Sequence, residues 1–154
     1  MAEQPLPGAG RRHGLTITRV LHAPRERVWR EWTEPEPFAD WYGGPQCEVP
    51  LESVAMDVRP GGAWRLTMLI GPREVHWRGE YLEVVEPERL VFTLSDQPGE
   101  EAYELINVVL TDLGDGRTGM FFQQSGNLTA EVYERAGQGW SSFFDRIAER
   151  LADA

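Results

Sequence analysis

Between residues 46 and 124 the chain alternates apolar and polar residues in short runs, and Pro, Gly or Asp separates one run from the next. The runs cover residues 48–58, 63–70, 74–85, 89–94, 102–113 and 117–124. Alternation with a period of two is typical of strands that bury one face. The connections are too short for the crossovers that parallel strands need. The pattern therefore predicts an antiparallel meander of about six strands.

After Gly126 the spacing of the apolar residues becomes that of an amphipathic helix that runs towards the C-terminus. A strand over residues 15–21 and two short helices, over residues 25–33 and 38–41, are predicted before the meander. A sheet with one apolar face must be covered, and the last helix is the only long apolar helix that the sequence predicts. The predicted fold class is therefore α+β, with a strongly curved antiparallel sheet of about six to seven strands wrapped around a long C-terminal helix. Such an arrangement leaves a cavity wherever helix and sheet are not in contact.

The charge balance excludes several classes of partner. The chain has 25 acidic residues against 15 basic ones, and its formal net charge is -10. Such a surface repels nucleic acid and anionic membranes, so neither is expected as a partner. The apolar runs are far shorter than the roughly 18 residues that span a bilayer, which predicts no membrane insertion. Cys47 is the single cysteine, so no intrachain disulfide can form and we expect a cytoplasmic protein.

A length of 154 residues suits one domain with a core large enough for an internal pocket. Residues 1–14 are rich in Pro and Gly and offer little to bury, which predicts a flexible N-terminal tail. Residues 15–154 are predicted to form a single domain, because no internal repeat or long linker divides them. The sequence leaves open whether this domain forms a homodimer, which exposed apolar side chains on the outer sheet face would favour.

Several local phrases occur in an order that resembles one known family. They are Ala23-Pro24, Asp40-Trp41-Tyr42-Gly43, Asp57-Val58-Arg59-Pro60-Gly61-Gly62, Gly79-Glu80-Tyr81, Arg89-Leu90-Val91-Phe92-Thr93 and Gly139-Trp140. The chain thereby resembles the START-like (SRPBCC) helix-grip superfamily, and within it the single-domain homologues of the activator of the heat-shock-protein ATPase. The resemblance implies the same fold. Relatives are described as lipid carriers, polyketide cyclases, antibiotic-sequestering proteins and chaperone cofactors, and the resemblance brings no invariant catalytic residue onto this chain.

Aromatic, Met and a few polar side chains are predicted to face a common interior between the sheet and the last helix. These candidate ligand-binding residues are Trp41, Trp64, Leu66, Met68, Trp77, Tyr81, Asn107, Met120, Phe122, Trp140, Phe143 and Phe144. A wide aromatic interior with few ionisable groups suits a flat apolar or aromatic small molecule. The alternative for each residue is that it simply packs in the core.

Asn107 is the sharpest polar candidate, because it stands between apolar residues on a strand and a buried amide needs a partner or a ligand. The alternative is that the strand faces outward there. A first hypothesis is therefore a small-molecule binding protein. A second is a cyclase-like or hydratase-like enzyme, in which Asn107 or Tyr81 polarises a carbonyl group. A third, with a protein partner, is an activator of a chaperone ATPase.

No metal site or cofactor is predicted. The residues His13, His22 and His76 do not stand at the spacing of metal ligands, and Cys47 has no neighbouring ligand. The Gly61-Gly62 pair opens a strand, whereas a phosphate-binding loop needs a helix start and usually a Lys, a residue that this chain lacks. No catalytic residue is assigned.

Overall fold

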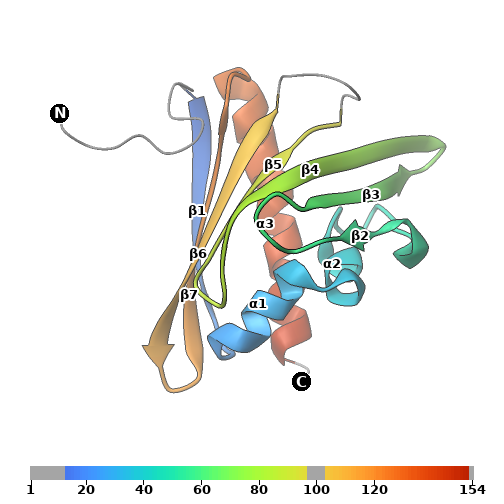
Figure 1. The fold of residues 1–154 in the computed structure, drawn as a ribbon. Coiled ribbons are helices and arrows are strands. Elements are labelled where there is room, and N and C mark those ends of the chain that lie inside the picture. Colours follow the sequence, from blue (N-terminus) through green and yellow to red (C-terminus); the bar gives the residue numbers. More distant parts are fainter. Residues whose placement is uncertain (1–12, 97–102, 153–154) are drawn as a thin grey trace.

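The computed structural model describes residues 13–96 and 103–152. Four elements begin the chain: strand β1 (His13–Leu21), helices α1 (Arg25–Thr33) and α2 (Pro35–Trp41), and the short 3-10 turn η1 (Leu51–Ser53). The remaining strands are β2 (Ala55–Met56), β3 (Ala63–Ile70), β4 (Arg73–Val85), β5 (Arg89–Leu94), β6 (Glu104–Gly114) and β7 (Arg117–Gly126). The long helix α3 (Ala130–Ala152) follows them (Figure 1).

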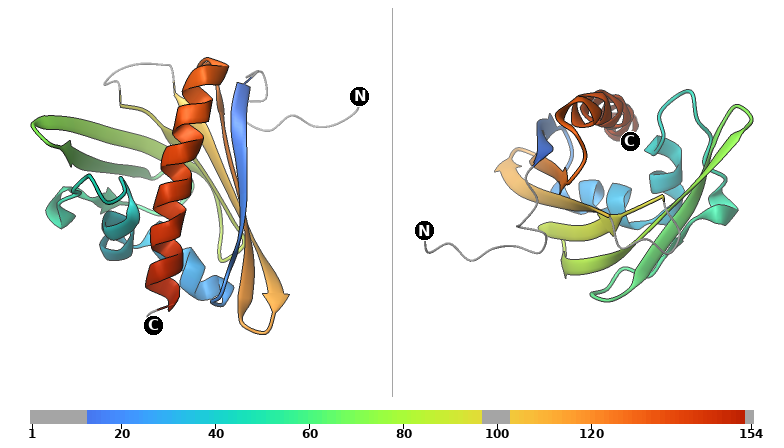
Figure 2. Two further views of the ribbon diagram at one scale, coloured as in Figure 1. Left: turned by 180° about the vertical axis from the view of Figure 1, so that it is seen from behind. Right: turned by 90° about the horizontal axis from the view of Figure 1, so that it is seen from above.

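The seven strands form one antiparallel sheet in the order β1-β7-β6-β5-β4-β3-β2. Strands β2 to β7 follow one another as a meander, and β1 pairs with β7, so the first strand lies beside the last. Viewed from above, the sheet forms an arc and α3 lies across its open side (Figure 2). The predicted α+β helix-grip fold, with two short helices after the first strand and a curved sheet around the last helix, is confirmed.

One predicted strand, over residues 48–58, is wrong. The segment holds an isolated bridge between Glu48 and Leu69, the turn η1 and the two-residue strand β2. Pro50 explains the break, because proline has no N–H for the ladder and stands at the start of η1. The predicted tail over residues 1–14 lies mostly outside the described residues, and its last two residues belong to β1.

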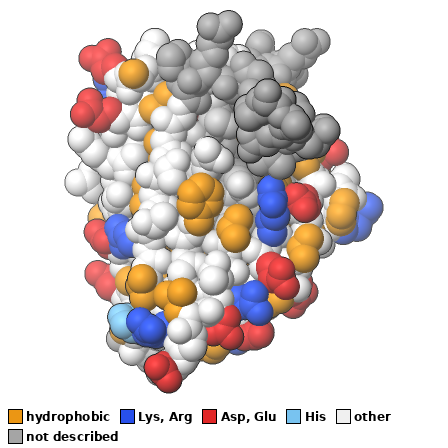
Figure 3. Space-filling view, turned by 90° about the vertical axis from the view of Figure 1, so that its left-hand side faces the viewer, with side chains coloured by type: hydrophobic (Ala, Val, Ile, Leu, Met, Phe, Trp, Pro, Cys, Tyr) orange, Lys and Arg blue, Asp and Glu red, His pale blue; other side chains and the backbone are white. Residues whose placement is uncertain are grey.

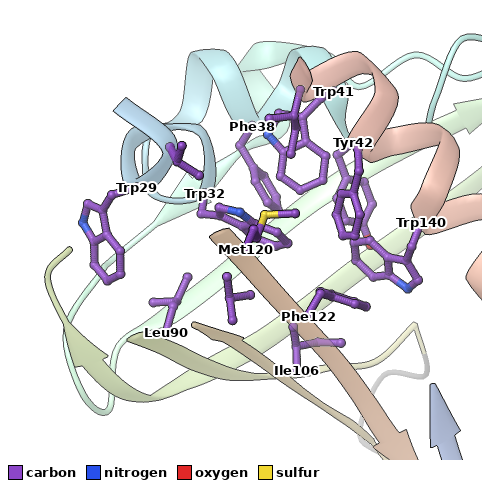
Figure 4. Close-up of a cluster of buried hydrophobic side chains, with 14 of the residues drawn as sticks. Trp29, Trp32, Phe38, Trp41, Tyr42, Leu90, Ile106, Met120, Phe122 and Trp140 are labelled. Atoms are coloured by element: carbon purple, nitrogen blue, oxygen red, sulfur yellow. The ribbon is translucent and has the colours of Figure 1, made fainter. Parts of the chain in front are cut away.

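Trp32 of α1 lies at the centre of an aromatic core between the sheet and the helices (Figure 4). Its ring contacts rings from α2, from the sheet and from α3, with centroids 4.8 to 6.5 Å apart. These rings belong to Phe38, Trp41, Phe92, Phe122, Trp140 and Phe144. Each pair of aromatic side chains adds about 0.5–1.5 kcal/mol to the burial of its apolar area. This cluster therefore fixes where α3 lies over the sheet.

An ionic cluster ties the C-terminal half of α3 to the two short helices. The Arg150 guanidinium donates to both carboxylate oxygens of Glu31 in α1, at 2.8 and 3.4 Å, and also contacts Asp40 in α2. Arg146 donates to the same Asp40 at 3.0 Å and to Glu149 at 3.2 Å. Glu31 is only 5% exposed, so its charge depends on Arg150.

The described surface shown in Figure 3 carries its apolar side chains separately, with Arg and acidic side chains between them. Exposed large apolar residues of the sheet include Val20, Val85 and Leu113. Scattered apolar side chains are normal on a protein surface and do not themselves indicate an interface. The homodimer stays a prediction.

Replacing Arg150 with Met is expected to lower the free energy of unfolding by about 2–4 kcal/mol, because Glu31 would be left as a buried carboxylate without its cation. Arg146→Met is the matched control. Arg146 contacts only half-exposed acids, so its loss is expected to cost about 0–1 kcal/mol. Urea denaturation of both variants measures the difference. Equal losses would show that the Glu31–Arg150 pair does not anchor α3.

Candidate functional site

A cavity of about 670 Å³ lies between the first half of α3 and the sheet. Strands β3 to β7 each contribute one side chain to it: Met68, Trp77, Leu94, Glu104 and Gln124. Helix α3 contributes Val132, Ala136, Gly139, Trp140 and Phe143. The rest of the wall is formed by Tyr42, Ser95, Asp96, Tyr103, Asn127 and Leu128. Both the sheet and the last helix thus contribute to the wall of this cavity.

Small residues on α3 explain why the cavity lies beside its first half. The second half turns Phe144, Ile147 and Leu151 into the core, where all three are buried. The first half turns Ala136 and Gly139 towards the sheet instead. A Cβ atom built on Gly139 would meet no atom within 4 Å. The helix therefore spans the sheet without filling the space beneath it.

A chain of hydrogen bonds crosses one wall of the cavity. The indole Nε1 of Trp140 donates to Oε1 of Gln124 at 2.8 Å, and Nε2 of Gln124 donates to Oε1 of Glu104 at 3.0 Å. The Tyr133 hydroxyl donates to the same Glu104 oxygen at 2.8 Å. Gly126 allows this arrangement, because a Cβ atom there would collide with the Glu104 carboxylate. The chain fixes the Trp140 ring and holds Glu104 at the cavity wall.

Tyr42 forms the corner where three other aromatic side chains of the cavity meet. Its ring lies 5.5 Å from Phe143, 5.9 Å from Trp140 and 6.5 Å from Trp77, measured between centroids. Burial raises the pKa of the Tyr42 hydroxyl far above its usual value, and the negative charge of Asp96 raises it further. Tyr42 therefore keeps its proton and presents a neutral hydroxyl among the rings.

The structure places four of the twelve predicted ligand-binding residues in the cavity wall: Met68, Trp77, Trp140 and Phe143. Seven others belong to the packed core, namely Trp41, Trp64, Leu66, Tyr81, Met120, Phe122 and Phe144. Two buried polar atoms explain part of this packing, since Trp41 Nε1 donates to the Glu31 carbonyl at 2.8 Å and Trp64 Nε1 to the Thr93 carbonyl at 3.0 Å. All eleven residues thus lie on the inner side of the fold, and four of them border the cavity.

The prediction that Asn107 faces the interior is wrong, because its side chain lies on the outer face of the sheet, away from the cavity. It pairs with Val91 and Gln123, and these three residues line a small pocket of about 20 Å³ on the outer face. Its Oδ1 is buried and has no hydrogen-bond partner among the described residues. The prediction failed because both faces of β6 are buried and carry apolar residues, so the sequence pattern did not reveal which face Asn107 occupies.

The sequence did not predict several residues of the cavity wall, above all Tyr42, Glu104, Ala136 and Gly139. The sequence could have indicated Ala136 and Gly139, because two small residues spaced three apart on an apolar helix face leave room beside the helix. Glu104 gave no such signal, because an isolated acid at the start of a strand usually lies in solvent.

No three His, Cys, Asp or Glu side chains within residues 13–96 and 103–152 come together as metal ligands would. No helix in the same part of the chain is long and apolar enough to cross a membrane.

Comparison with known proteins gives the family. The family model described as "Activator of Hsp90 ATPase homolog 1-like protein" matches residues 22–152, which include α1, α3 and most of the sheet. The chain belongs to this family. None of the curated proteins matches the sequence.

Solved structures show how widely this AHSA1-like fold is shared. Protein CV1439 from Chromobacterium violaceum is 27% identical with a TM-score of 0.78, and the match covers 90% of this chain and 96% of that one. The AHSA1 protein SPO3351 from Silicibacter pomeroyi has a TM-score of 0.79 at 20% identity, with 91% and 98% covered. CalU16 from Micromonospora echinospora has a TM-score of 0.66 at 19% identity, with 90% and 75% covered. The last two likenesses concern the fold alone.

Replacing Gln124 with Met is expected to lower the free energy of unfolding by about 2–3 kcal/mol, because Trp140 Nε1 would lose its acceptor and Glu104 one donor. Gln123→Met is the matched control on the opposite face of the same strand. That side chain is only partly buried, and its replacement is expected to change stability by less than about 0.5 kcal/mol. Thermal and urea unfolding compare the two variants, and similar losses would contradict a structural role for the chain of hydrogen bonds.

Proposed function

We propose that this AHSA1-like protein binds an apolar or aromatic small molecule in the cavity between α3 and the sheet. The observation that carries the proposal is the cavity itself, whose volume of about 670 Å³ falls within the usual range for ligand pockets. Its walls are mostly aromatic and aliphatic, and a few polar groups occur at defined positions. Sites for small molecules commonly combine these two properties.

Packing does not explain this space. Protein interiors are packed about as densely as organic crystals, with few voids larger than a water molecule. The neighbouring core reaches that state, since Trp32, Phe122 and Phe144 are 0 to 1% exposed and contact one another closely. Beside it, Ala136 and Gly139 occupy positions on α3 where larger side chains would fill the cavity. A bound ligand would supply the missing contacts.

The other hypotheses gain no support from the geometry. The enzyme hypothesis named Asn107 and Tyr81 as the groups that polarise a carbonyl, and neither lines the cavity. Burial and the charge of Asp57 raise the pKa of Tyr81 well above its usual value, so this hydroxyl also keeps its proton. The chaperone hypothesis has the family's description in its favour and no feature of the described surface.

The direct test fills the cavity from the helix. Gly139→Leu adds a side chain where a Cβ atom meets open space, so it should fold and gain helix propensity of about 0.5–1 kcal/mol. We expect it to weaken the binding of N-phenylnaphthylamine, a neutral aromatic dye, by roughly tenfold, because the added side chain competes for the same volume. Dye fluorescence and quenching of the protein's tryptophan fluorescence measure the affinity.

Gly137→Leu is the matched control on the same helix. Gly137 lies two residues away, faces the groove beside β1 and does not line the cavity. This variant gains similar helix propensity and should bind the dye as the original protein does. If both variants bind the dye with the original affinity, or if the original protein binds none, the cavity is not a ligand site and the proposal fails.

A further inference from the structure

The charged groups of the cavity wall all have the same sign. Among the described lining residues, Asp96 and Glu104 are charged, and no Arg or His lines the space with them. Asp96 and Tyr42 line the same cavity, and the negative charge of Asp96 raises the pKa of the Tyr42 hydroxyl. Glu104 lies on β6 at the opposite end of the chain of hydrogen bonds that begins at Trp140. An apolar cavity thus contains two acids.

The hydrogen-bond donors to Glu104 carry no positive charge. Its Oε1 accepts two hydrogen bonds, from the Gln124 amide and the Tyr133 hydroxyl, and both donors are neutral. By contrast Glu31, which is buried, is paired with the guanidinium of Arg150. Neutral donors stabilise a carboxylate without cancelling its charge, whereas a guanidinium cancels it. Within the described part of the chain, Glu104 therefore presents an uncompensated negative charge to the cavity.

The aromatic walls favour the same kind of ligand. Tyr42, Trp77, Tyr103, Trp140 and Phe143 line the space. The face of an aromatic ring attracts a cation that lies within about 6 Å of its centre. A cation in this cavity would thus meet both carboxylates and ring faces, while an anion would be repelled by both. The net charge of -10 also raises the local concentration of cations around the protein.

We propose that the ligand of this cavity is a hydrophobic cation: an apolar or aromatic molecule that carries a protonated amine or a quaternary ammonium group. This inference rests on the proposed function and adds the class of ligand. The apolar part would occupy the space beneath Ala136 and Gly139, and the cationic group would lie near Glu104 and Asp96. The same cavity would bind an anion of similar shape most weakly.

Three pyrene compounds of matched shape test the proposal: pyrenylmethylamine, which is cationic near neutral pH, pyrenylmethanol, which is neutral, and pyrenylacetate, which is anionic. Energy transfer from tryptophan to pyrene measures the three dissociation constants at moderate salt. We expect the cation to bind roughly tenfold more tightly than the neutral compound, and the anion to bind most weakly. The double variant Glu104→Gln with Asp96→Asn should remove the preference for the cation over the neutral compound.

Asp115→Asn is the matched control for general electrostatics. Asp115 is exposed in the turn between β6 and β7, does not line the cavity and has a positive φ of 58° that Asn tolerates. This variant loses one negative charge and should keep the tenfold preference. If the double variant does not fold, Asp96→Asn alone provides a second test, because Glu104 then keeps its hydrogen bonds to Gln124 and Tyr133. The single variant should reduce the preference for the cation.

The outcomes separate the two proposals. Binding of the neutral compound without a preference for the cation would overturn the ligand class and leave the binding function standing. The preference for the cation would have to be attributed to the overall charge if it survives in the double variant, or in Asp96→Asn where only that variant folds. The same holds if the preference falls equally in Asp115→Asn. Either result would also overturn the ligand class. If none of the three compounds binds, both proposals fail.

Discussion

The position of α3 depends on the aromatic cluster around Trp32. This one side chain contacts rings from α2, β5, β7 and α3, so it joins elements that are far apart in the sequence. The Glu31–Arg150 pair holds the same end of α3 against α1. Because the second half of the helix is fixed in this way, its first half needs to touch the sheet only at positions such as Tyr133 and Trp140, and open space remains beside Ala136 and Gly139. Dense packing at one end thus makes open space at the other compatible with a stable fold.

Most of the fold could be predicted from the sequence because it depends on periodicity and turn residues. The strands β3, β4 and β5 lie within a residue of their predicted bounds, since Pro and Gly mark their ends and their side chains alternate clearly. The segment around Pro50 departs most from the prediction. There, alternation continued through residues whose backbone does not form a ladder. Local patterns therefore determine the elements, and a proline overrides them.

The candidate site could be predicted only in part, because periodicity assigns a side chain to a face and not to a depth. Trp64 and Trp77 are directed towards the same interior from adjacent strands, yet Trp64 is buried against the Thr93 carbonyl and Trp77 lines the cavity. Gly79 explains why the Trp64 ring is buried more deeply than the Trp77 ring. A Cβ atom there would collide with the Thr93 carbonyl and crowd the indole nitrogen of Trp64, so the ring of Trp64 lies directly over the glycine. Such close approaches depend on tertiary packing, which the sequence pattern does not contain.

Glu31, which is buried, and Glu104, which is half-buried, show that this chain holds acids in two different ways. Glu31 lies where helices α1 and α3 meet, and there a guanidinium both neutralises it and joins the helices. Glu104 lies where helix and sheet separate, and its partners are an amide and a phenol that satisfy its hydrogen bonds without supplying positive charge. Neutral donors suffice for Glu104 because its carboxylate is only half-buried, whereas the buried carboxylate of Glu31 needs a cation. The negative charge of Glu104 therefore stays available to a ligand in the cavity, which is what the proposed ligand class requires, while the charge of Glu31 is used to join the helices.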